Sequence, residues 1–168
     1  YCLSLILIFK KVLKNMVAYL SGPIENAKDD GISWRDDITI WLDSHLNHKV
    51  FNPVTETQSK IKECAKNDFR SMKRTDPFEY KKIIRKIIKL DLEAVINDSD
   101  YLIVNWDKSV LKGGGTHGEI TMAYWIKKPI YIVTSLPIED MSSWIFACAD
   151  FVVEDFRHLK KKLKQMYC

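Results

Sequence analysis

Short apolar runs recur along the chain and alternate with longer amphipathic stretches. Five of these runs stop at polar or turn-forming residues, as buried strands do: residues 17–20, 49–51, 101–106, 130–133 and 151–153. Four longer segments are predicted helices: residues 33–46, 78–96, 115–125 and 154–166. Ser33 would cap the first of them. Continuously apolar strands that alternate with helices predict an α/β fold with a parallel sheet covered on both faces.

Two segments stand apart from this pattern. Residues 1–15 begin with an apolar run that is followed, not preceded, by lysines, and Met16 stands directly before the first predicted strand. The run is too short to span a bilayer as a helix, and its order of charges differs from that of a signal peptide. We therefore expect residues 1–15 to be an extension outside a single domain covering 16–168. Residues 55–76 are polar and irregular, which predicts either a mobile lid or a helical insertion.

Composition and charge narrow the class of protein. The 168 residues are 46% hydrophobic and 29% charged, with a net charge of +4, which suits one ordinary globular domain. The basic residues concentrate in 60–89 and 160–164, where solvated helical faces are the simpler interpretation, and we expect no nucleic-acid partner. The four cysteines and four histidines show no metal-ligand spacing. We expect a cytoplasmic protein with no membrane partner, no metal and no cofactor.

A glycine-rich turn, Gly113-Gly114-Gly115, joins the strand at 101–106 to the helix at 115–125. The glycines would allow a sharp turn and leave backbone N–H groups open to a ligand, and Thr116 would cap the helix. Glu119 admits two interpretations. It stands at capping-box spacing from Thr116, or it faces a ligand at the sheet edge where open α/β folds bind. His117 is expected at the rim of that site.

Asp91, on the predicted helix 78–96, stands between two leucines. It either pairs with Arg85 or Lys89 on the polar side of the helix, or it projects into the same crevice as Glu119. Two carboxylates in different environments are what cleavage of a glycosidic bond requires. Neither a phosphate loop nor a dinucleotide-binding glycine motif is present.

Several short sequences occur in an order that resembles the nucleoside 2-deoxyribosyltransferases and their nucleotide N-hydrolase relatives. They span nearly all of residues 16–134: 18–24, Trp34-Arg35, 50–53, Asp91-Leu92, Ser99-Asp100, 115–120 and 128–130. The resemblance implies a flavodoxin-like, Rossmann-like three-layer sandwich with a five-stranded parallel sheet. It also implies a homo-oligomer, a dimer or larger, in which neighbours complete each site.

The resemblance further implies an activity in nucleotide salvage. Glu119 would attack the anomeric carbon of a 2'-deoxyribosyl group, and Asp91 would position and protonate the leaving base. A second nucleobase would then accept the sugar, or water would in the hydrolase relatives. The residues expected to bind the deoxynucleoside or deoxynucleotide are Tyr19, Ser21, Gly22, Pro23, Asn52, Asp107, Gly115 and Thr116.

The chain departs from the family at the glycine turn. Where the transferases carry an Asp before the nucleophile, and the monophosphate hydrolases a Ser, this chain has only Gly113-Gly114-Gly115. Asp107 would have to substitute for that acid. The basic residues Lys60, Arg70, Lys73 and Arg74 would favour a 5'-phosphate. The first expectation is thus a deoxyribosyltransferase, and the alternatives are a deoxynucleoside 5'-monophosphate N-glycosidase or a non-catalytic nucleotide-binding module.

Overall fold

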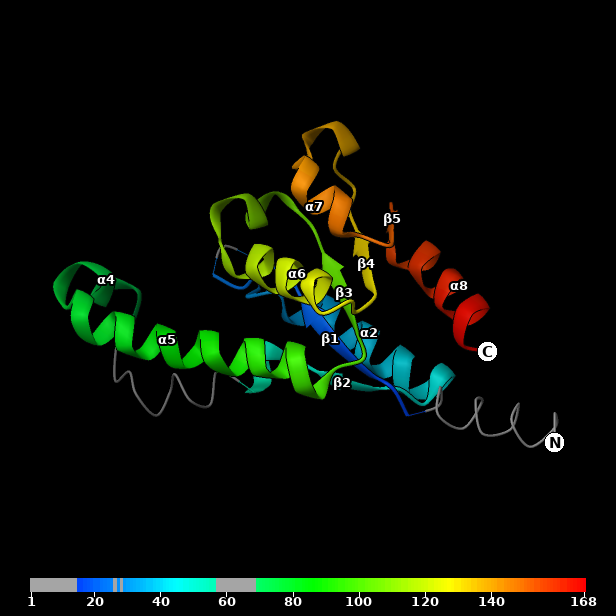
Figure 1. Ribbon diagram of the computed structural model, residues 1–168, viewed down its shortest axis with the longest axis horizontal. Coiled ribbons are helices and arrows are strands. Elements are labelled where there is room, and N and C mark those ends of the chain that lie inside the picture. The colour runs from blue at the N-terminus through cyan, green and yellow to red at the C-terminus, as the bar shows by residue number, and fades with distance from the viewer. Residues whose placement is uncertain (1–14, 26, 28, 57–68) are drawn as a thin grey trace.

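The computed structural model describes residues 15–25, 27, 29–56 and 69–168 (Figure 1). Its centre is one parallel sheet with the strand order β2-β1-β3-β4-β5. The strands are β1 (Val17–Ser21), β2 (Lys49–Phe51), β3 (Tyr101–Asn105), β4 (Ile130–Val133) and β5 (Phe151–Val153). All neighbouring strands pair in parallel, so the predicted five-stranded flavodoxin-like α/β fold is confirmed.

Helices cover both faces of this sheet (Figure 1). The α-helices are α2 (Ile32–Leu46), α4 (Met72–Thr75), α5 (Pro77–Glu93), α6 (Gly115–Trp125), α7 (Ser143–Cys148) and α8 (Phe156–Tyr167). Short helical turns occur at η1 (Phe69–Ser71), η2 (Ala94–Asp98, a π turn), η3 (Lys108–Lys112) and η4 (Ile138–Asp140). The short helix α7 had not been predicted.

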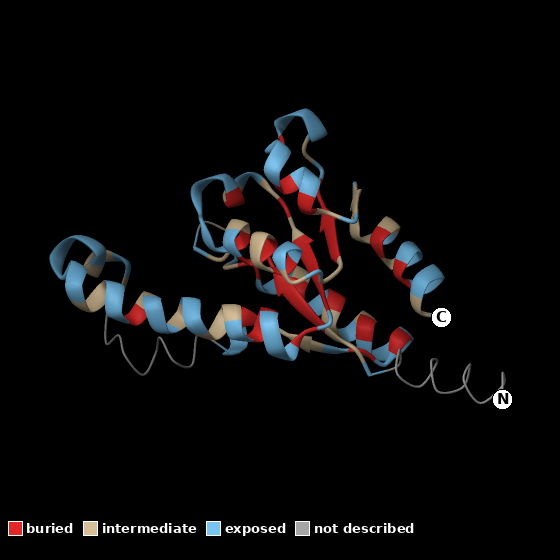
Figure 2. Ribbon diagram, viewed as in Figure 1, coloured by how far each residue is buried: buried red, intermediate tan, exposed pale blue. Residues whose placement is uncertain are grey.

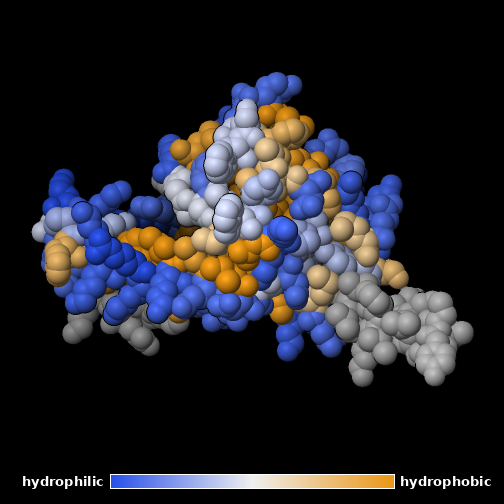
Figure 3. Space-filling model, in the orientation of Figure 1, coloured by the Kyte–Doolittle hydropathy of each residue, from blue (hydrophilic) through white to orange (hydrophobic). Residues whose placement is uncertain are grey.

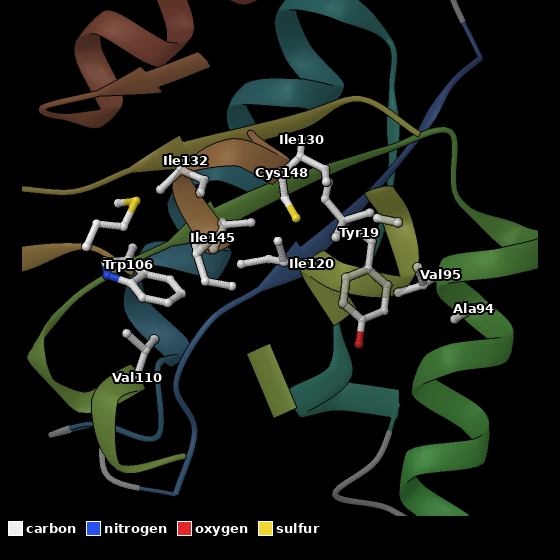
Figure 4. Packing of buried hydrophobic residues seen from close by; sticks show 14 residues of the cluster. Tyr19, Ala94, Val95, Trp106, Val110, Ile120, Ile130, Ile132, Ile145 and Cys148 are labelled. Atoms are coloured by element: carbon white, nitrogen blue, oxygen red, sulfur yellow. The ribbon is translucent and has the colours of Figure 1, made fainter. Parts of the chain in front are cut away.

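Each face of the sheet has its own hydrophobic core. On one face, α6, α7 and η2 pack through residues such as Val95, Ile120 and Ile145 (Figure 4). On the other face, α2 and α8 pack through residues such as Leu42 and Leu159. The central strands β1, β3 and β4 supply side chains to both cores and are the most buried part of the molecule (Figure 2), which explains why they are continuously apolar in sequence.

Two predicted helix caps are wrong. Helix α2 begins at Ile32, and the carboxylate of Asp29 accepts hydrogen bonds from the backbone N–H groups of Gly31 and Ser33 and from the Ser33 hydroxyl. Ser33 is therefore a donor inside the first turn and not the cap. Helix α6 begins at Gly115 after the capping residue Gly114, with no capping hydrogen bond from a side chain, so Thr116 is not its cap either.

Helix α5 projects away from the sheet (Figure 1). Asp76 caps it by accepting a hydrogen bond from Glu79 N at 3.1 Å, and Pro77 stands at the first position. Ile83 is its one buried residue, whereas Ile88 is 50% and Phe78 76% exposed. A strip of hydrophobic surface accordingly runs along α5 (Figure 3). Most of this amphipathic helix thus shows its apolar side to solvent in the single chain.

Part of the sequence expectations falls on residues outside the described ranges. These are residues 1–14 of the expected extension and residues 57–68 of the expected lid or insertion. The described remainder of the second segment is largely helical and consists of residues 53–56, η1 and α4. The domain boundaries stay a prediction. Within the described ranges, no helix has the length and apolar character needed to cross a membrane.

Candidate active site

The candidate site lies at the carboxyl ends of β1 and β3, which are neighbours in the sheet. The chain after β1 leads to α2 on one face, and the chain after β3 leads to α6 on the other. Open α/β sheets bind ligands at such a reversal of the strand order. Glu119, the fifth residue of α6, reaches this point and is only 9% exposed.

Two hydroxyl groups from β1 hold the carboxylate of Glu119. The Tyr19 hydroxyl donates to Oε1 at 2.9 Å, and Ser21 Oγ donates to Oε2 at 2.5 Å. Tyr19 and Ser21 are two positions apart on one strand, so their side chains point to the same face of the sheet. Figure 4 shows the Tyr19 hydroxyl at the margin of the apolar cluster. The interpretation of Glu119 as a cap of its own helix is therefore wrong.

The electrostatics of Glu119 combine opposing effects. Burial raises the pKa of Glu119, while the hydrogen bonds from Ser21 and Tyr19 and the charge of Arg35 lower it in part. The pKa of Tyr19 is also raised, first by burial and then by the nearby negative charges of Glu119 and Asp91. None of the ion pairs between described residues involves Glu119. The carboxylate is thus held by hydroxyls and not by a directly contacting cation.

Asp91 lies near the end of α5, just before the π turn η2, and is half-buried. Its charge raises the pKa of both Tyr19 and Arg35, so it lies within electrostatic reach of the site. Lys89 was considered as a partner of Asp91, and its Nζ atom lies 3.7 Å from Glu93 Oε1. The interpretation in which Asp91 projects into the same crevice as Glu119 stays a prediction.

Arg35 is a site residue to which the sequence analysis assigned no role. It is 0% exposed and donates hydrogen bonds to four backbone carbonyls around the end of β1. A signal was present in the sequence, because Arg35 precedes Ile38 and Leu42 on the buried stripe of α2. A charged residue on the buried side of a helix indicates a specific partner inside the fold.

Two of the predicted binding residues serve as caps of the turns that follow them. Asn52 Oδ1 accepts from Val54 N at 3.0 Å, and Asp107 Oδ1 accepts from Ser109 N at 2.7 Å. The remaining predicted residues lie on the two segments that carry Ser21 and Glu119. Gly22 and Pro23 are buried in the loop after β1, Thr116 is buried in α6, and Gly115 is exposed at its start. The structure thus brings Tyr19, Ser21 and Glu119 into direct contact and leaves Asn52 and Asp107 in local roles.

The glycine turn was expected to need glycine for a sharp change of backbone direction, and this expectation is wrong. Gly113 has φ −116° and Gly114 has φ −106°, values that any residue adopts, so the turn does not require glycine for its backbone angles. A Cβ atom added at Gly113, Gly114 or Gly115 would meet nothing within 4 Å. The glycines therefore leave open space beside the start of α6. Behind them, the His117 ring lies edge-on to Trp106 at 5.0 Å, and its Nδ1 is buried with no partner among the described residues.

Other polar groups and hollows lie away from this site. Among described residues, the one group able to hold a metal ion is Glu154, Asp155 and His158, and Asp155 there caps α8 through His158 N at 2.8 Å. A cavity of about 510 Å³ lies between the ends of α6 and α7, at the amino edge of the sheet. Of its three charged residues, Lys128 and Asp150 bind backbone groups and Lys127 is exposed, so no buried acid or base lines this cavity as Glu119 does the candidate site.

A scan of the chain against protein-family models finds no match, and a search of curated proteins finds none. The resemblance seen in the sequence therefore stays a prediction.

Proposed function

We propose that this protein cleaves the N-glycosidic bond of 2'-deoxynucleosides with Glu119 as nucleophile and transfers the deoxyribosyl group to another nucleobase. The observation that carries the proposal is the Glu119 carboxylate, buried at the β1/β3 edge and bonded through both oxygens to hydroxyls. Burying a carboxylate opposes folding unless its charge is compensated, and perturbed acids gather at functional sites. Together with the family resemblance, this supports a catalytic role, which we place in cytoplasmic nucleotide salvage.

The reaction follows from these groups. A Glu119 oxygen forms a bond to C1' of the deoxyribose while the bond from C1' to the base nitrogen breaks. The electron pair of that bond leaves with the base, which takes up a proton, and Asp91 is the proposed donor. The acceptor base then attacks C1' of the glycosyl ester and loses a proton, and Glu119 leaves as a carboxylate. Tyr19 and Ser21 keep the carboxylate from rotating, so that one oxygen stays directed at C1'.

One observation favours a second candidate, the hydrolysis of deoxynucleoside 5'-monophosphates. Arg70, beside α4, lies 3.2 Å from Asp30 in the loop between β1 and α2. This contact places Arg70 next to the loop that follows Ser21, and Lys73 and Arg74 are exposed on α4 itself. Basic side chains at this position would attract a phosphate on the sugar. Water would then take the place of the second base.

We also propose that the protein assembles as a dimer or larger homo-oligomer. The support is the apolar side of α5, where Ile88 and Phe78 are exposed beside half-buried isoleucines. Continuous hydrophobic surface of this kind usually marks a contact with another protein. Sedimentation velocity of the full chain measures this directly, and a monomer at micromolar concentration would contradict it.

The proposed function is tested by incubating the protein with 2'-deoxyinosine or with deoxynucleoside monophosphates, with and without added adenine or cytosine. Chromatography follows the products, and Glu119→Gln serves as the inactive control. A new nucleoside that appears only with added base establishes the transferase. Free base released without exchange establishes the hydrolase. Binding without turnover of any substrate would contradict both and leave a nucleotide-binding module.

A further inference from the structure

Arg35 is the most unusual buried group outside the proposed reacting pair. Its guanidinium donates from Nε to Leu20 O at 3.3 Å, from Nη2 to Gly22 O at 2.9 Å and from Nη1 to Gly31 O at 2.8 Å. A longer bond of 3.5 Å reaches Pro23 O. None of the ion pairs between described residues involves Arg35. This buried cation therefore contacts carbonyl oxygens and no acidic side chain.

The loop after β1 is shaped to receive this guanidinium. Gly31 has φ 71°, and a Cβ there would collide with Arg35 Nη1 and with Pro23 O. A Cβ on Gly22 would come within 3.0 Å of the Trp34 ring, which itself lies 4.5 Å from the Arg35 guanidinium carbon. Two glycines thus allow the loop to close around one side chain.

Ser21 is the residue that this arrangement fixes. Its neighbours Leu20 and Gly22 both give their carbonyl oxygens to Arg35, so its backbone is anchored on each side. Its hydroxyl donates to Glu119 Oε2 at 2.5 Å. The direction of this hydroxyl therefore depends on a side chain from α2, on the opposite face of the sheet from α6.

The charges of Arg35 and Glu119 also act on each other. Burial lowers the pKa of Arg35 to about 10, and the nearby charge of Glu119 is the largest effect in the other direction, followed by Tyr19, Asp29 and Asp91. Arg35 therefore stays charged at neutral pH. In return, its positive charge opposes the effect of burial on the Glu119 pKa. The other groups that act on this pair are Tyr19 and Ser21 from β1, Asp29 from the loop before α2 and Asp91 from α5.

We propose that Arg35 is a positioning residue for the nucleophile: it fixes the backbone on both sides of Ser21 and supplies the positive charge that balances the buried Glu119 carboxylate. Its guanidinium is buried against the backbone of the loop, so Arg35 acts without contacting the substrate. Its effect on catalysis rests on the proposed function, whereas its effect on the ionisation of Glu119 can be measured without any turnover.

The test is a carboxyl titration by NMR of protein with ¹³C-labelled glutamate. The Glu119 signal is assigned by its loss in Glu119→Gln. Arg35→Gln removes the charge, Arg35→Lys keeps it, and Arg157→Gln removes the same charge from an 83% exposed position on α8. We expect Arg35→Gln to move the Glu119 midpoint up by about one pH unit or more, as loss of a nearby opposite charge does. Arg35→Lys and Arg157→Gln should leave it close to wild type.

An unchanged midpoint in folded Arg35→Gln would overturn the inference, whatever the activity. If that variant does not fold, the double variant Arg35→Gln/Glu119→Gln decides. Recovery of folded protein supports the charge balance, whereas a raised Glu119 midpoint in folded Arg35→Lys, which keeps the charge, overturns it. A shifted midpoint in a protein that turns over no substrate would instead overturn the proposed function and leave the role of Arg35 standing. In an active enzyme, the acidic limb of the pH–rate profile should move up in Arg35→Gln but not in Arg35→Lys.

Discussion

The two edges of the sheet both bury tyrosine hydroxyls, but they give them different partners. At the amino edge, the Tyr101 hydroxyl lies 2.8 Å from His48 Nδ1, and the hydroxyls of Tyr131 and Tyr167 lie 2.6 Å apart. At the carboxyl edge, the Tyr19 hydroxyl donates to the Glu119 carboxylate. Burial raises the tyrosine pKa at both edges. The difference is that, among these hydrogen bonds, only the one at the carboxyl edge has a buried acid, Glu119, as its acceptor.

The amino-edge network is what a stable core requires. Aromatic rings fill the space between α2, α8 and the strands, and their polar ends satisfy one another. The acids of that edge stay at the surface, where Asp100 and Asp150 accept hydrogen bonds from backbone N–H groups. Glu119 has no such exposure. A buried carboxylate is tolerated in a fold mainly where its chemistry is used, and this contrast is the main physical argument for the proposed site.

The largest expected effect is that of replacing Glu119, the proposed nucleophile. Glu119→Gln keeps the shape of the side chain but removes its nucleophilic oxygen charge, so base release should fall by at least about a thousandfold. Asp150→Asn, at the amino edge, should leave the rate within about twofold, as an exposed residue away from the chemistry. Chromatographic assays of both variants, with circular dichroism as the check of folding, measure the difference. More than about one per cent of wild-type activity in Glu119→Gln would refute the nucleophile assignment.

The next effect concerns protonation of the leaving base. Asp91→Asn removes the proposed proton donor and should lower the rate by about a hundredfold. The basic limb of the pH–rate profile should also change, because the group that has to be protonated is gone. Glu93→Gln is the matched control, since Glu93 is exposed on the same helix and lies 3.7 Å from Lys89. An unaltered pH–rate profile in Asp91→Asn would assign the proton transfer to another group.

A smaller effect separates the two kinds of tyrosine. Tyr19→Phe removes a hydrogen bond to a charged group and should lower the rate roughly tenfold or more. Tyr131→Phe removes a hydroxyl bonded to another hydroxyl and should lower the free energy of unfolding by about 1 kcal/mol without changing the rate. Steady-state kinetics and urea denaturation of both variants give the comparison. Equal rates in the two variants would remove the distinction between the edges.

The smallest effect is on stability and has a defined dependence on pH. The folded-state pKa of Glu119 lies above its ordinary value of 4.5, so between these two values the unfolded chain binds fewer protons than the folded one. The free energy of unfolding of the wild type should therefore fall as pH rises through that window. Glu119→Gln has no ionisable group at this position, so its free energy of unfolding should not fall in this window. At pH 7 it should exceed that of the wild type by on the order of 1 kcal/mol for each unit of pKa shift.

Urea denaturation of the wild type and Glu119→Gln between pH 4 and pH 8 checks the sign. Tyr131→Phe, at the amino edge, should be less stable than wild type by a similar amount across that whole range, because burial raises the pKa of Tyr131 and of its partner Tyr167 far above it. A Glu119→Gln variant that is less stable than wild type at pH 7 would show that the charge of Glu119 stabilises the fold.

Much of the architecture was predictable because strands and long helices leave periodic patterns. All five strands lie where the apolar runs stand, with ends that differ by at most one residue, such as Ser21 at the end of β1. Local hydrogen bonds were harder to predict. The cap at Ser33 was wrong because Asp29 accepts the hydrogen bonds of the first N–H groups, and the cap at Thr116 was wrong because α6 begins one residue earlier, at Gly115. Helix α7, only six residues long, is too short to show a period.

The sequence by itself determined the α/β class and the places of the strands, and it pointed to Glu119 and Asp91 as candidate acids. Only the tertiary structure decided that Glu119 bonds to Tyr19 and Ser21, which lie 100 and 98 residues away. It also decided that Arg35 holds the loop after β1 and that Asn52 and Asp107 cap turns. The physical reason is that side-chain periodicity is local to one element. The partners of a buried polar group depend on which strands become neighbours, here β1 beside β3.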